Sequence, residues 1–166
     1  FFTNDFSLQY VWAYSNIELD YFYKFSSFWG GQKGSLLFWT LILTSYMLVA
    51  YFQNRSKSLI VVPYAMAVML GITAFFLILL NFSTNPFERI PLPPEDGRGL
   101  NPLLQNYWMV IHPPTLYLGY VGFTVPFAFA VAALISKNLD DSWIRLTRKW
   151  TVVSWFFLCM GNLFGA

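Results

Sequence analysis

Residues 59–82 read LIVVPYAMAVMLGITAFFLILLNF, an unbroken run without a charged side chain. A helix needs roughly 20 mostly apolar residues to cross the hydrocarbon core of a bilayer. Residues 35–52, 114–135 and 150–166 form three further uncharged runs. At about 1.5 Å per residue, the first three runs along the chain would measure about 27, 36 and 33 Å as helices. The sequence therefore predicts an all-α, polytopic integral membrane bundle with about four transmembrane helices.

The composition also favours a membrane protein. Of the 166 residues, 57% are apolar and 11% are charged, whereas soluble domains carry about 25% charged residues. These values exclude a disordered chain and disfavour an ordinary soluble domain. A net charge of +2 gives no electrostatic basis for binding nucleic acid. The single cysteine, Cys159, excludes an internal disulfide framework, and we interpret it as a packing residue.

The basic residues predict the orientation of the helices. The turns at 53–58 and 136–149 hold six of the ten basic residues, whereas the long segment between the second and third runs carries acids beside its arginines. By the positive-inside rule, the two basic turns are cytoplasmic, and residues 1–34 and 83–113 are external. We expect residues 1–166 to form a single membrane domain. We further expect them to be an internal piece of a longer protein, because the chain does not start with Met and ends within an apolar run.

The two external segments are rich in aromatic and proline residues. Aromatic side chains of the density found in residues 1–34 suit the membrane interface. Residues 19–28 are compatible with a short surface helix in which Asp20 and Lys24 lie one turn apart. The glycine-rich residues 30–34 lack the spacing of a phosphate-binding loop, so we interpret them as a tight turn into the first span.

His112 is the only histidine, and residues 107–114 read YWMVIHPP. The residue before a proline is biased away from helical backbone angles, and proline favours the first turn of a helix. We therefore expect the third span to start at Pro113 or Pro114, with His112 at its cap. The partial positive charge of a helix N-terminus favours the neutral imidazole, which is the form that binds metals.

One histidine cannot form a zinc site, but it can supply one axial ligand of haem. The alternative is an interfacial histidine that bonds a backbone group or water. The four spans contain no Asp, Glu, Lys or Arg, which argues against an ion or proton pathway. Gly119 and Gly122 would permit a close approach of another helix or of a cofactor.

Residues 108–122, WMVIHPPTLYLGYVG, closely resemble the core signature of the CcmF/NrfE family, the membrane haem-lyase proteins of cytochrome c maturation. Four further stretches resemble the same family in the same order: TNDFS at 3–7, WGGQKGSLLFW at 29–39, NPLLQ at 101–105 and VPFAFA at 125–130. The resemblance covers essentially the whole chain.

The resemblance implies a site for b-type haem in transit at the outer face of a bacterial inner membrane. In that family, a haem chaperone, CcmE, delivers haem, and two external histidines hold it beneath a Trp-rich segment. Only His112 matches one of these haem ligands, and the Trp-rich segment is expected shortly after Ala166. Trp108 and Trp29 are expected to form walls of a haem or chaperone surface.

The resemblance further implies membership of a cytochrome c haem lyase that attaches haem to the thiols of apocytochrome c. Its partners would include CcmE, a thiol-handling subunit of the CcmH type, apocytochrome c and membrane lipid. The alternatives are a haem channel or transporter without ligation activity, and a structural membrane subunit with no cofactor. No residue has the pattern of a general acid or base, so the expected contribution is orientation of haem.

Overall fold

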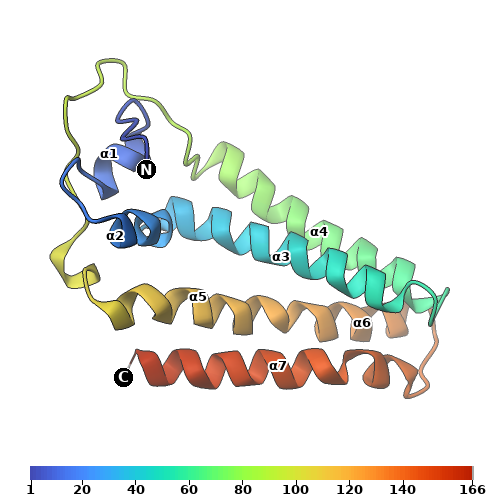
Figure 1. The fold of residues 1–166 in the computed structure, drawn as a ribbon. Helices are drawn as coiled ribbons and strands as arrows, with labels where there is room; N and C mark the ends of the chain where they lie inside the picture. The colour runs from blue at the N-terminus through green and yellow to red at the C-terminus, as the bar shows by residue number, and fades with distance from the viewer. Residues whose placement is uncertain (166) are drawn as a thin grey trace.

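The computed structural model describes residues 1–165, and this range is helical apart from loops and one isolated bridge between Leu8 and Arg89. In chain order, the elements are α1 (Gln9–Tyr14), α2 (Tyr21–Ser26), η1 (Ser27–Trp29), α3 (Gln32–Asn54), α4 (Val61–Phe82), η2 (Pro102–Leu104), α5 (Tyr107–Gly122), α6 (Thr124–Ile135) and α7 (Ser142–Phe164). The long helices lie side by side, and the short ones gather at one end (Figure 1). The expected helical membrane bundle is confirmed.

Within residues 1–165, three segments are long and apolar enough to cross a membrane: α3, α4 and the combined segment 107–135. In the third, α5 and α6 follow one another with only Phe123 between them. Apolar side chains of α4 such as Leu70, Phe75 and Ile78 are exposed, as is usual for lipid-facing positions. Helix α7 has 23 residues and contains Arg145, Arg148 and Lys149 within its first eight, so its crossing as a fourth span stays a prediction.

The third span begins earlier than the proline pair indicated. Helix α5 starts at Tyr107, and the side chain of Asn106 caps it by accepting a 2.9 Å hydrogen bond from the backbone N–H of Trp108. Pro113 and Pro114 lie inside the helix. The expectation that the helix starts at one of these prolines, with residues up to 113 in a loop, is therefore wrong. The cap supplied by Asn106 determined the start instead.

The proline pair is compatible with a helix because another side chain replaces a missing donor. Pro114 has no N–H for the carbonyl of Val110, which is four residues earlier. The indole Nε1 of Trp29 donates a buried 3.2 Å hydrogen bond to that carbonyl. Trp29 is itself 8% exposed, and its ring stacks on Phe38 at a centroid distance of 5.4 Å. The buried carbonyl of Val110, which has no backbone donor at Pro114, thus accepts a hydrogen bond from Trp29 of η1.

The expected short helix is present as α2. The carboxylate of Asp20 caps the helix by accepting the N–H of Phe22 at 2.8 Å. Lys24 is only 4% exposed, and its Nζ donates to Asn4 Oδ1 at 2.8 Å and to the carbonyl of Ile17 at 3.1 Å. Asp20 and Lys24 lie one turn apart, as expected, and capping and burial give each side chain its own partners.

The glycine-rich turn leads directly into α3, as expected. The hydroxyl of Tyr10 accepts the N–H of Gly31 at 2.9 Å and lies within 3.2 Å of the carbonyls of Phe28 and Gly31, to which it can donate. Burial raises the pKa of Tyr10 far above its ordinary value. One buried hydroxyl from α1 therefore satisfies the backbone of the turn that orients the first span.

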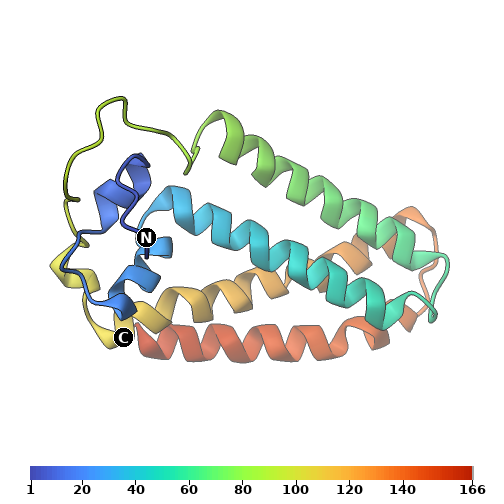
Figure 2. The same cartoon turned by 45° about the horizontal axis from the view of Figure 1, so that its top comes forward.

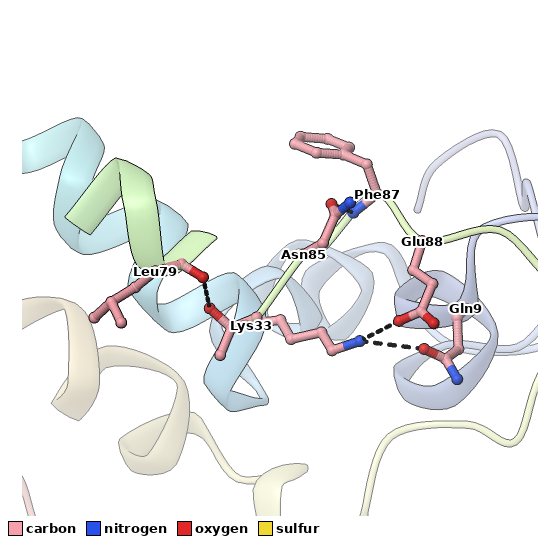
Figure 3. A network of polar contacts seen from close by, with 7 residues as sticks. Gln9, Lys33, Leu79, Asn85, Phe87 and Glu88 are labelled. Atoms are coloured by element: carbon pink, nitrogen blue, oxygen red, sulfur yellow. Dashed lines mark hydrogen bonds and ion pairs between the residues drawn. The ribbon is translucent and has the colours of Figure 1, made fainter. Parts of the chain in front are cut away.

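The proline-rich loop at 83–106 is attached to the N-terminal elements. Lys33 Nζ at the start of α3 contacts Glu88 Oε2 at 2.7 Å and Gln9 Oε1 at 3.2 Å (Figure 3). Farther along the loop, the guanidinium of Arg98 lies 4.1 Å from the ring centroid of Trp12. These contacts keep the loop over one end of the bundle.

The two basic turns lie at one end of the bundle and the N-terminal elements at the other (Figures 1 and 2). The start of α5 and the end of α7 lie at the N-terminal end. This arrangement agrees with the predicted division into a basic end and an aromatic end. Their assignment to the cytoplasmic and external sides stays a prediction.

Helices α5 and α7 interlock through reciprocal glycines. A Cβ atom on Gly119 of α5 would come within 2.6 Å of Leu158, and one on Gly161 of α7 within 2.7 Å of Leu116. Gly122 is similarly close to Ser154. The expectation that Gly119 and Gly122 permit close helix approach is confirmed, and small residues at such interfaces are usual in membrane bundles.

We predict that Trp29→Phe destabilises the protein by about 1–3 kcal/mol, because the carbonyl of Val110 would lose its partner while the ring contacts are largely retained. The measurement is denaturant unfolding in detergent micelles of the protein expressed from its native reading frame. Trp39→Phe is the matched control, since the indole of Trp39 donates no hydrogen bond to residues 1–165. Equal effects of both substitutions would contradict the role of the indole N–H.

Candidate functional site

The imidazole of His112 is oriented by a carbonyl of the neighbouring helix. Nδ1 of His112, in the second turn of α5, lies 2.7 Å from the carbonyl oxygen of Gly161 on α7. A carbonyl only accepts hydrogen bonds, so Nδ1 carries the hydrogen and is the donor. In the neutral ring, the free lone pair is therefore on Nε2, which is the atom available to a metal.

The ring of His112 faces the C-terminal end of α7, whereas the sequence predicted that it lies at the N-terminus of its own helix. Gly161 lies in the last turn of α7, and its carbonyl also accepts the backbone N–H of Gly165 at 3.2 Å. Carbonyls at a helix C-terminus carry partial negative charge and lack a full set of partners, so they attract a donor such as Nδ1–H. The expectation of His112 at the N-terminal cap is wrong. Its tautomer is determined by α7 instead.

Gly165 makes room for the imidazole. A Cβ atom at this position would overlap Cε1 of His112 and would come within 2.5 Å of Nδ1. The ring is half-buried and lies against the backbone that follows α7. The absence of a side chain at Gly165 therefore allows the hydrogen bond between Nδ1 and Gly161.

An aromatic patch lies beside His112, and it is made of the exposed Tyr107 and Trp108 and the half-buried Phe164. Trp108 precedes His112 by one helical turn and so lies on the same face of α5. Its side chain is 53% exposed, and its ring centroid lies 5.6 Å from that of Phe164 and 5.5 Å from that of Tyr107. The sequence singled out Trp108, but Phe164, Gly161 and Gly165 were missed because only packing of α7 against α5 brings them to the histidine.

Trp29 does not belong to this surface. It is buried beneath α5, where it bonds the carbonyl of Val110. The expected part of Trp29 in a haem or chaperone surface stays a prediction.

Residues 1–165 contain no group of three or more His, Cys, Asp or Glu side chains that could hold a metal ion. Cys159 is exposed on α7. At this end of the bundle, Nε2 of His112 is the imidazole nitrogen that could bind a metal. One axial ligand from this segment is enough for haem binding to begin here, because the porphyrin nitrogens occupy four positions on the iron.

Comparison with known proteins identifies the family. The model of the family described as "Cytochrome C assembly protein" matches residues 29–166. Over 167 aligned positions, the chain is 46% identical to the cytochrome c-type biogenesis protein CcmF of Pseudomonas aeruginosa. The chain belongs to the CcmF/NrfE family. Over the same aligned length, it is 41% identical to CcmF of Escherichia coli and to NrfE of Haemophilus influenzae.

The matches to these CcmF and NrfE proteins cover the whole chain but only a quarter of each relative, 25% of the Pseudomonas protein and 26% of the other two. No solved structure matches the chain significantly. The segment therefore corresponds to one part of the longer CcmF/NrfE proteins, and its histidine and aromatic patch are one part of any site that they form.

We predict that Gly165→Ala displaces the imidazole of His112 from Gly161 and increases the accessibility of both ring nitrogens. The rate of His112 modification by diethyl pyrocarbonate, followed by peptide mapping, should rise several-fold. Gly71→Ala is the control, because a Cβ atom there would meet nothing within 4 Å. An unchanged rate for Gly165→Ala would contradict the orientation of the ring by α7.

Proposed function

We propose that the chain acts in cytochrome c maturation, binding haem through Nε2 of His112 and holding it for attachment to apocytochrome c. The observation that carries the proposal is the 2.7 Å contact between Nδ1 of His112 and the carbonyl of Gly161. Histidines that bind metals almost always donate their other N–H to a backbone carbonyl, a carboxylate or water, which fixes the ring and the tautomer. His112 has this arrangement.

The surroundings of His112 fit a porphyrin. The aromatic patch is apolar and open, and it lies next to the half-buried imidazole, so it offers a surface for the face or edge of a flat ring. The neutral imidazole supplies one axial ligand, and the porphyrin nitrogens supply four. A second histidine ligand would come from outside this chain, since His112 is its only histidine.

In the proposed reaction, haem is the substrate. Each cysteine thiol of apocytochrome c adds across a haem vinyl group, so that sulfur bonds to one vinyl carbon and the proton goes to the other. Both reacting groups belong to haem and to apocytochrome c. The role of His112 is to orient the porphyrin, which lowers the entropic cost of bringing each vinyl group to a thiol.

The relatives' names support the general process, since each is called a cytochrome c-type biogenesis protein. We further propose that His112 faces the periplasm at a bacterial inner membrane, because the basic turns lie at the opposite end of the bundle. There it would receive haem from a chaperone of the CcmE type and meet apocytochrome c with a CcmH-type thiol-handling subunit.

We predict that His112→Gly in the protein expressed from its native reading frame lowers its Soret absorbance after purification. Added imidazole should restore the band, because a free imidazole can occupy the space left by the side chain and bind iron. Cytochrome c maturation in cells should fall in parallel, and an absorption spectrum together with a haem stain of cellular cytochromes measures both effects.

Asn162→Gly provides the control for helix destabilisation, since Asn162 is exposed on α7 and its side chain bonds only its own helix. Unchanged spectra and normal maturation in the His112 variant would overturn the proposal and favour a structural membrane subunit. Loss of the Soret band with normal maturation would also contradict the proposal, because haem bound by His112 would then not be needed for attachment to apocytochrome c.

A further inference from the structure

A second candidate site lies at the basic end of the bundle, away from His112. A cavity of about 840 Å³ opens between α3 and α7, with α5 contributing to its wall. Cavities of 300–1,000 Å³ are typical of sites for small molecules. The end of α3 and the start of α7 line one part of it, called the mouth below, and both lie at the end of the bundle that carries the basic turns (Figure 1).

The polarity of the cavity changes along the helix axes. Lys57, Arg145 and Lys149 line the part nearest the turns. Farther along the bundle, the wall is apolar or aromatic and includes Leu118 and Phe157. Phe157 follows Lys149 by eight residues, which is about 12 Å along a helix. The cavity therefore has a cationic mouth and an apolar interior.

Two of the cations at the mouth lack an acidic partner. Among residues 1–165, neither Lys57 nor Lys149 has a carboxylate within ion-pair distance, whereas Arg145 pairs with Asp141. The other acid of the adjoining turn, Asp140, accepts hydrogen bonds from Ser142. The mouth thus presents net positive charge, which an anionic group can compensate.

Further polar atoms stand at the same mouth. Trp150 Nε1 donates to Gln53 Oε1 at 3.1 Å, linking α7 to α3. The ring of Trp150 also packs edge-on against Tyr46 at a centroid distance of 5.0 Å. Gln53 lines the cavity, and its amide NH₂ donates to no residue in the described range. It is therefore available to a phosphate or an ester carbonyl.

We propose that this cavity binds an anionic phospholipid. Its phosphate lies at Lys57 and Lys149, and an acyl chain extends along Leu118 and Phe157. Basic pockets between transmembrane helices recognise anionic lipid headgroups in this way. Free phosphate would satisfy the cations but would leave the apolar interior empty, so the continuous apolar wall favours a lipid over the free anion.

The test compares two double variants with the same change in net charge. Lys57→Gln/Lys149→Gln removes the two unpaired cations of the cavity, whereas Arg55→Gln/Arg148→Gln removes neighbouring charges that do not line it. The protein expressed from its native reading frame is placed in phosphatidylcholine nanodiscs. Native mass spectrometry then measures retained phosphatidylglycerol as its proportion in the bilayer is raised, with inorganic phosphate as a competitor.

We expect the lysine variant to bind phosphatidylglycerol at least tenfold more weakly and the arginine variant to bind as the wild type does. Equal weakening in both variants would overturn the proposal in favour of general surface electrostatics. Unchanged lipid binding in both double variants would also overturn the proposal. That result is expected if another segment of the protein fills the cavity. Displacement of the lipid by millimolar phosphate would reassign the site to the free anion.

Discussion

The approach of α5 to α7 across glycines is the constraint on which the histidine site depends. Gly119 and Gly161 each receive a leucine of the other helix, and larger side chains at either position would separate the two backbones. Because the two helix backbones lie close together, the imidazole of His112 reaches the carbonyl of Gly161. The hydrogen bond determines which ring nitrogen keeps a lone pair, so helix packing determines the chemistry of the side chain.

The passage of α5 through its proline pair involves a second interaction, from a distant part of the chain. Two prolines deprive the first turns of the helix of backbone donors, and Trp29 replaces one of them at the carbonyl of Val110. This bond crosses 81 positions of sequence, and it couples the turn before α3 to the helix that carries His112. The same requirement explains why Trp29 is buried while Trp108 remains exposed.

The two ends of the bundle have opposite chemical character. The aromatic end carries the histidine and the aromatic patch, and it suits a flat apolar ligand with a metal centre. The basic end carries an elongated cavity with unpaired lysines at its mouth. A lipid bound there would contact α3, α5 and α7, the last two of which also form the histidine site.

The sequence by itself determined the helical membrane bundle, because uncharged runs of about 20 residues suit the hydrocarbon core whatever their neighbours are. It also identified His112, since a lone histidine beside two prolines is conspicuous. The start of α5 follows from the local cap that Asn106 supplies, whereas the tautomer of His112 and the burial of Trp29 were decided only by tertiary structure. Each of these two depends on a partner from a distant segment, namely a carbonyl of α7 or a carbonyl of α5, and local backbone preferences contain no information about such partners.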